Sequence, residues 1–145
     1  MSAQKQQKSQ PFSIRLSRVT DLLVSEEMRR TGRSRSAVVE DLADEAAKMR
    51  IFPGIGFRGP EPRRAWVIGT GLDVWEIVEM HRECEGDVQL LVEDYESLSE
   101  RAIKLALVYA ERFPDEIEER LAANRRPLSE LLELYPFAQV VYIDE

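Results

Sequence analysis

The pattern of apolar positions begins with a strand-like alternation. Phe12, Ile14 and Leu16 alternate with polar residues, and this period of two is typical of a strand with one buried face. A single short strand is unstable alone and leaves both edges unpaired. We therefore expect a partner strand, and its obvious source is a second copy of the chain.

Helical spacing follows directly after this alternation. Ser17 is an N-cap candidate for a first helix, which is expected to stop at Gly32, where glycine can adopt the left-handed conformation beyond a helix end. Ser34 is the next N-cap candidate, and apolar residues recur after it at helical spacing. Residues 11–50 are therefore predicted to form strand, helix, tight turn and helix, after a flexible polar tail over residues 1–10.

A stretch rich in glycine and proline, "FPGIGFRGPEPRR", breaks the helical pattern after Ile51. We place a domain boundary there. The segments "GIGFR" and "RRAWVIG" flank the proline-rich turn, and they are expected to pair as a β-hairpin. The hairpin would open a second domain over residues 53–124.

The rest of the second half is dominated by helical patterns. One helix is expected to begin near residues 72–73, a short one over "DVQLLVEDYE", and a longer one after the N-cap candidate Ser99. Within residues 102–110 only Lys104 is polar, and a helix that is apolar nearly all round is buried on several sides. We expect it to be the central helix of the domain or part of its dimer contact. Two more helices are predicted over "DEIEERLAANRR" and "LSELLELY".

Charge divides the chain into a basic front and an acidic back. Residues 1–36 carry eight Lys/Arg and three Asp/Glu, a balance of +5. Residues 51–145 carry 10 Lys/Arg and 20 Asp/Glu, a balance of −10, within a net charge of −7 for the whole chain. Like charges repel, so the front is suited to a polyanion such as nucleic acid and the back to a protein partner.

Several function classes find little support in the sequence. It has no apolar run long enough to span a membrane and no secretory signal, so we expect a cytoplasmic protein without membrane contact. Cys84 is the only cysteine and His81 the only histidine, which supports no metal site, and we interpret His81 as a surface residue. Phosphate-binding loops and nucleophile motifs are missing, so we expect neither an enzyme nor a cofactor.

The segments "SIRLS" and "TGRSRSAVVEDLADEA" resemble the strand, the turn and the second helix of the ribbon-helix-helix family of DNA-binding regulators. The resemblance implies an intertwined dimer whose paired strands form a ribbon in the DNA major groove. The alternative is a strand that only dimerises, with solvated arginines. The resemblance assigns Phe12, Ile14 and Leu16 to the dimer core. It assigns Ser13 and Arg15 to bases, with Pro11 or Ser17 at the margins, and Arg33, Ser34, Arg35 and Ser36 to phosphates.

The segments "FPGIGFRG", "VIGTGLDVWEIVE" and "IKLALVYAER" resemble a second family, known as domain of unknown function 433. Two departures from the family pattern are Gly71, which stands where an Arg is usual, and "GPEPRR", which looks inserted. The resemblance implies a winged-helix-like α+β domain. The expected fold is therefore mainly α with small β: a ribbon-helix-helix domain and then a winged-helix-like domain, for which the acidic charge favours a protein-contact role over DNA binding.

Some members of the second family are similar to VapB-type antitoxins, which pair with PIN-like ribonuclease toxins. This likeness predicts a dimeric antitoxin that represses its own operator and neutralises such a toxin. The alternatives are a stand-alone ribbon-helix-helix repressor without a toxin partner, and a scaffold that binds no DNA. Residues 125–145 are the expected toxin-binding tail, which would add a strand to an exposed sheet edge, unless the tail packs on its own domain or on a second copy. Its candidate contact residues are Arg125, Arg126, Phe137, Val140 and Tyr142.

Overall fold

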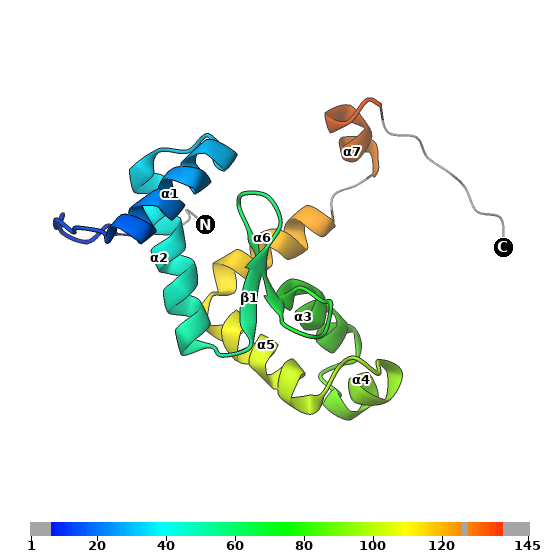
Figure 1. Cartoon of the computed structure of the whole chain (residues 1–145). Coiled ribbons are helices and arrows are strands. Elements are labelled where there is room, and N and C mark those ends of the chain that lie inside the picture. Colours follow the sequence, from blue (N-terminus) through cyan, green and yellow to red (C-terminus); the bar gives the residue numbers. More distant parts are fainter. Residues whose placement is uncertain (1–6, 126–127, 138–145) are drawn as a thin grey trace. The chain divides into compact units, whose positions relative to one another are not determined.

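The computed structural model describes residues 7–125 and 128–137 (Figure 1). The chain is mainly helical and has a small two-stranded antiparallel sheet, in agreement with the predicted class. It divides into two compact units, unit 1 (Met1–Asp44) and unit 2 (Glu45–Glu145). In the described ranges, none of the helices is both long and apolar enough to cross a bilayer.

Unit 1 is built on two helices, α1 (Arg18–Thr31) and α2 (Arg35–Ile51), and the last turns of α2 belong to unit 2. The predicted start and end signals are confirmed. The Ser17 side chain accepts a hydrogen bond from the backbone N–H of Thr20 (3.2 Å). Gly32 is left-handed (φ 69°), and its N–H donates to the Met28 carbonyl (2.8 Å). The Ser34 hydroxyl accepts from the backbone N–H of Ala37 (3.2 Å). Ser17 and Ser34 therefore cap the starts of α1 and α2, and Gly32 caps the end of α1, as the sequence indicates.

The segment before α1 is neither helix nor strand in the single chain. Phe12 is 79% exposed and Ile14 64% exposed, whereas Leu16 is half-buried. A ribbon needs hydrogen bonds from a second strand, and one chain offers none to this segment. The strand therefore stays a prediction about the dimer.

In unit 2, the predicted hairpin follows the end of α2. Strands β1 (Ile55–Arg58) and β2 (Arg64–Val67) pair antiparallel, with Ile55 opposite Val67 and Arg58 opposite Arg64. In the described part of unit 2, five helices follow, and their starts agree with the predicted positions to within two residues: α3 (Val74–Glu83), α4 (Val88–Asp94), α5 (Glu100–Arg112), α6 (Pro114–Asn124) and α7 (Leu128–Leu134).

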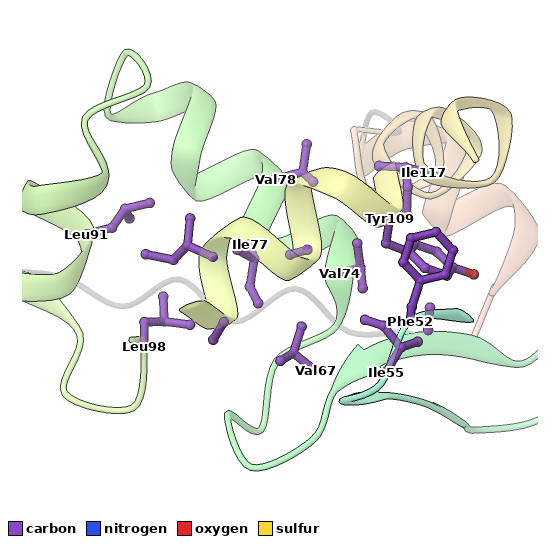
Figure 2. Packing of buried hydrophobic residues seen from close by; sticks show 14 of the residues in the cluster. Phe52, Ile55, Val67, Val74, Ile77, Val78, Leu91, Leu98, Tyr109 and Ile117 are labelled. Carbon is purple, nitrogen blue, oxygen red and sulfur yellow. The ribbon is translucent and has the colours of Figure 1, made fainter. Parts of the chain in front are cut away.

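Helix α5 lies at the centre of the unit 2 core, as its apolar sequence predicts (Figure 2). It packs against α3, α4, α6 and β2. Ile103 and Tyr109 of α5 are fully buried, while Val108 is exposed on the remaining side. The described core also contains Phe52, Ile55, Ala65, Val67, Val74, Ile77, Val78, Leu91, Leu98, Ala102, Ala106, Ile117 and Leu121.

The end of α2 is tied into this core by an aromatic cluster. The ring of Phe52 meets those of Tyr109 and Phe113 edge-on, with centroids 5.4 and 5.8 Å away. The Tyr109 hydroxyl donates to the Glu116 carboxylate (2.9 Å), so this buried phenol keeps a polar partner. The Lys48 ammonium lies 3.5 Å from Glu116 and 4.6 Å from the Phe113 ring centroid, within range of a cation–π contact.

Candidate nucleic-acid interface

The residues predicted to contact bases lie in the segment ahead of α1, which is neither helix nor strand. Ser13 and Arg15 are exposed, and no hydrogen bond or ion pair holds either side chain to the described part of the chain. In a strand, alternate residues face opposite sides, so pairing of this segment in a ribbon would place Ser13 and Arg15 opposite the apolar set that contains Ile14. Both side chains are thus available to a ligand on the polar side.

Ser17 already has a structural role. Its hydroxyl accepts the backbone N–H of Thr20 (3.2 Å) and donates to the Thr20 hydroxyl (2.9 Å). A serine hydroxyl has one proton to donate, so a base that accepts from Ser17 would compete with Thr20. Ser17 positions the start of α1, whether or not it also reaches a base.

The residues predicted to contact phosphates gather at the start of α2. Ser34 caps the helix, and the backbone N–H groups of Arg35 and Ser36 occupy first-turn positions, which have no partner within a helix. The positive end of the helix dipole adds to these donors, and together they favour an anion.

Arg33 and Arg35 are paired with carboxylates in the single chain. Arg33 lies 2.6 Å from Asp41, and Arg35 pairs with Asp21. Their side chains remain 38% and 50% exposed. Exposed ion pairs contribute only about 0–1 kcal/mol. Each arginine can therefore exchange its carboxylate for a phosphate at small cost.

Helix α1 exposes an apolar face. Val19, Leu22 and Leu23 of α1 are exposed, together with Phe12 and Ile14 of the preceding segment. Among the described apolar residues of unit 1, Val24 and Val38 are the two that are buried. Two buried valines make no sufficient core for a folded unit, so this face needs an apolar partner.

Two exposed cations of unit 1, Arg18 and Arg29, were not among the predicted contact residues. They lie at opposite ends of α1. The charge count of residues 1–36 includes both, but nothing in their spacing distinguishes a phosphate contact from a solvated helix residue.

Sequence reasoning also missed a charged cluster in unit 2. Asp73 is almost completely buried and accepts hydrogen bonds from Arg58 Nε (2.8 Å) and Arg64 Nε (2.6 Å). Burial alone would raise the pKa of the Asp73 carboxyl, but the hydrogen bonds and charges of Arg64 and Arg58 outweigh it and hold that pKa below its ordinary value. The residues come from the hairpin and the start of α3, and no spacing motif links them.

The candidate toxin-binding residues are only partly described. Arg125 is exposed at the end of α6, where its backbone N–H donates to the carbonyls of Leu121 and Ala122 (both 3.2 Å). Phe137 is 82% exposed, and its ring centroid lies 6.0 Å from that of Tyr135. Arg126, Val140 and Tyr142 lie outside the described residues.

His81 and Cys84 are near the end of α3, and both are half-buried. His81 is thus less exposed than a simple surface residue. Across residues 7–125 and 128–137, no group of three or more His, Cys, Asp or Glu side chains is arranged to hold a metal ion.

No protein-family model, curated protein or solved structure matches the chain. The two family resemblances therefore rest on the motifs themselves. Among the side chains described above, those of unit 1 form the most coherent candidate site.

Proposed function

We propose that the chain is a dimeric DNA-binding regulator of ribbon-helix-helix type, in which unit 1 of two copies reads operator DNA in the cytoplasm. The observation that carries the proposal is the combination of a segment with exposed side chains, apolar and polar in alternation along the sequence, and two capped helices that lack a core of their own. Pairing with a second copy would supply the missing strand and cover the apolar face in one step.

The polar side of the paired strands would enter the major groove. A two-stranded ribbon fits this groove, and each base pair presents a distinct pattern of donors and acceptors there. The guanidinium of Arg15 can donate two parallel hydrogen bonds to O6 and N7 of guanine, and the hydroxyl of Ser13 can bond several base edges. These two residues would carry the sequence preference.

The start of α2 would position the dimer on the DNA backbone. The backbone N–H groups of Arg35 and Ser36 would donate to a phosphate, and the guanidinium groups of Arg33 and Arg35 would leave Asp41 and Asp21 to pair with it. Such contacts set register and affinity but carry no sequence information.

The test separates base reading from phosphate binding. Fluorescence anisotropy would measure binding of the full chain to duplex DNA from upstream of its own gene and to a scrambled duplex, over a series of salt concentrations. Arg15→Ala should lose about 1–3 kcal/mol on the operator and much less on the scrambled duplex. Arg35→Ala should weaken both duplexes about equally and reduce the salt slope by about one.

Arg101→Ala is the matched control for these variants, because Arg101 is an exposed arginine of unit 2 for which no partner is found in the described chain. It should bind both duplexes like the unaltered chain. If Arg15→Ala keeps the original ratio of operator to scrambled affinity, Arg15 does not read a base.

We further propose that this regulator is an antitoxin whose unit 2, winged-helix-like under this proposal, binds a PIN-like ribonuclease together with the C-terminal tail. Two features support a protein partner: the acidic balance of residues 51–145, and the exposed side chains of Leu134, Tyr135 and Phe137. Exposed apolar residues close together in sequence are typical of a segment that packs on a partner.

The antitoxin proposal is tested with the product of the adjacent gene. A chain that ends at Asn124 should still dimerise and bind operator, but it should co-purify with the tagged toxin much more weakly than the full chain and leave its ribonuclease activity uninhibited. Equal binding and inhibition by both chains would move the contact to residues 53–124. No complex with either chain would favour the stand-alone repressor.

A further inference from the structure

The Asp73 cluster of unit 2 brings together two arginines and both tryptophans of the chain. The carboxylate of Asp73 accepts Arg58 Nε on one oxygen, and Arg64 Nε (2.6 Å) and Trp75 Nε1 (3.2 Å) on the other. The guanidinium of Arg58 also lies 4.7 Å from the centroid of the Trp66 ring. The sequence contains no other tryptophan.

The two guanidinium groups are held in place from several sides. Arg58 Nη2 donates to the Gly71 carbonyl (3.0 Å) as well as lying 2.7 Å from Asp73. Arg64 lies against the hairpin turn, where a Cβ on Gly59 would come within 2.5 Å of Arg64 Nη1. Glycine at this turn therefore leaves room for the arginine. An arginine that is already ordered loses little entropy when it binds an anion.

The buried carboxylate of Asp73 neutralises only part of the positive charge of Arg58 and Arg64, and it accepts from only some of their N–H donors. Asp73 carries one negative charge, whereas the two guanidinium groups carry two positive charges. The nearby Glu76 carboxylate accepts the backbone N–H of Asp73 (2.7 Å), and it forms no ion pair with either arginine in the described chain. Nη1 of Arg58 and both Nη atoms of Arg64 have no hydrogen-bond partner among the described residues. The side chains remain 35% and 33% exposed, so these donors can be reached from solvent.

We propose that Arg58 and Arg64 form a phosphate-binding site in unit 2, for which Asp73 is the positioning residue. A phosphate group offers more than two oxygens, so it can accept hydrogen bonds from both guanidinium groups at once. The Nε atoms of the two arginines would continue to donate to Asp73. The proposal concerns unit 2 alone and does not depend on DNA binding by unit 1. The phosphate is either part of a nucleic-acid backbone or a free phosphate ester.

The tryptophans make the site measurable without a label. Inorganic phosphate would be titrated into the full chain in exchange for sodium chloride at constant ionic strength, and intrinsic fluorescence would be recorded. The chain should show a saturable change, because Trp66 stacks on Arg58 and Trp75 shares its carboxylate with Arg64. Arg64→Gln should weaken this binding by about tenfold or more, since charge-assisted hydrogen bonds are lost.

Two further variants keep the result interpretable. Arg101→Gln removes an exposed arginine of the same unit and should leave the phosphate affinity unchanged. The double variant Arg64→Gln/Asp73→Asn removes one positive and one negative charge, so it leaves no buried carboxylate without its arginine. It should also lose phosphate binding, while its circular dichroism spectrum stays native. A chain with no saturable response, or equal losses for Arg64→Gln and Arg101→Gln, would overturn the site.

The source of the phosphate is decided by DNA binding of the same variants. A salt slope reduced by about one in Arg64→Gln assigns the phosphate to a DNA backbone. An unchanged slope together with a saturable phosphate response assigns it to a free phosphate ester. Because the fluorescence titration contains no DNA, failure of this proposal and failure of operator binding by unit 1 are separate results.

Discussion

Replacing Ile14 by alanine should weaken the proposed dimer about a hundredfold. The Ile14 side chain is 64% exposed in the single chain, and in a ribbon it would face the partner copy. The change to alanine removes three carbons, and each buried carbon contributes about 0.8 kcal/mol. If the partner buries the exposed 64% of the side chain, the binding free energy lost is about 1.5 kcal/mol per copy and about 3 kcal/mol per dimer. This loss raises the dissociation constant of the dimer by about two factors of ten.

Sedimentation velocity over a dilution series measures this loss directly, because it gives the dissociation constant of the dimer. The matched control is Ser13→Ala, which alters the neighbouring side chain on the polar side and should leave the constant unchanged. A dissociation constant for Ile14→Ala within a factor of three of the unaltered chain would refute burial of Ile14 between copies. Equal weakening by Ser13→Ala would refute the assignment of the two faces.

Three further predictions concern the folded units. Ile103→Ala should destabilise unit 2 by about 2–5 kcal/mol in urea unfolding, because Ile103 is fully buried in α5, whereas Val108→Ala on the exposed side of that helix should stay within about 0.5 kcal/mol. Gly32→Ala should cost about 1–2 kcal/mol of helix stability by circular dichroism, since Gly32 is left-handed but its site has open space; a fully neutral change would contradict the helix end described above. Asp73→Asn should destabilise unit 2 at neutral pH and lose this effect in acid. The folded pKa of Asp73 lies below its ordinary value of 3.8, so its contribution is fully present above that value and disappears as the pH falls through the folded pKa. Unfolding at a series of pH values checks this, and a difference independent of pH would be inconsistent with the ion pairs.

Sequence reasoning was most successful where neighbours along the chain decide the structure. A cap bonds to a backbone N–H three residues away, as Ser17 and Ser34 do, and the left-handed residue that ends α1 favours glycine whatever the tertiary fold. The hairpin and the central position of α5 were predicted for similar reasons, since turn residues and apolar periodicity are local signals.

Sequence reasoning was least successful where distant residues meet. Arg58 and Asp73 are 15 residues apart, and they come together only because the hairpin packs beside the start of α3. The same arginines in the sequence read simply as charges that flank a proline-rich turn. The strand at residues 12–16 is limited in another way, because its hydrogen bonds must come from a molecule other than the chain itself.

Under the proposed function, the contrast between the two buried valines of unit 1 and the continuous core of unit 2 would have a consequence for gene control. Unit 2 has a core of its own, but if unit 1 folds only in pairs, the folded fraction of unit 1 rises with the amount of chain in the cell. When most chains are single, doubling their number raises the number of pairs fourfold. A regulator built in this way would leave its operator open while scarce and close it steeply as it accumulates, so the threshold for repression would be set by how little core the operator-binding unit contains.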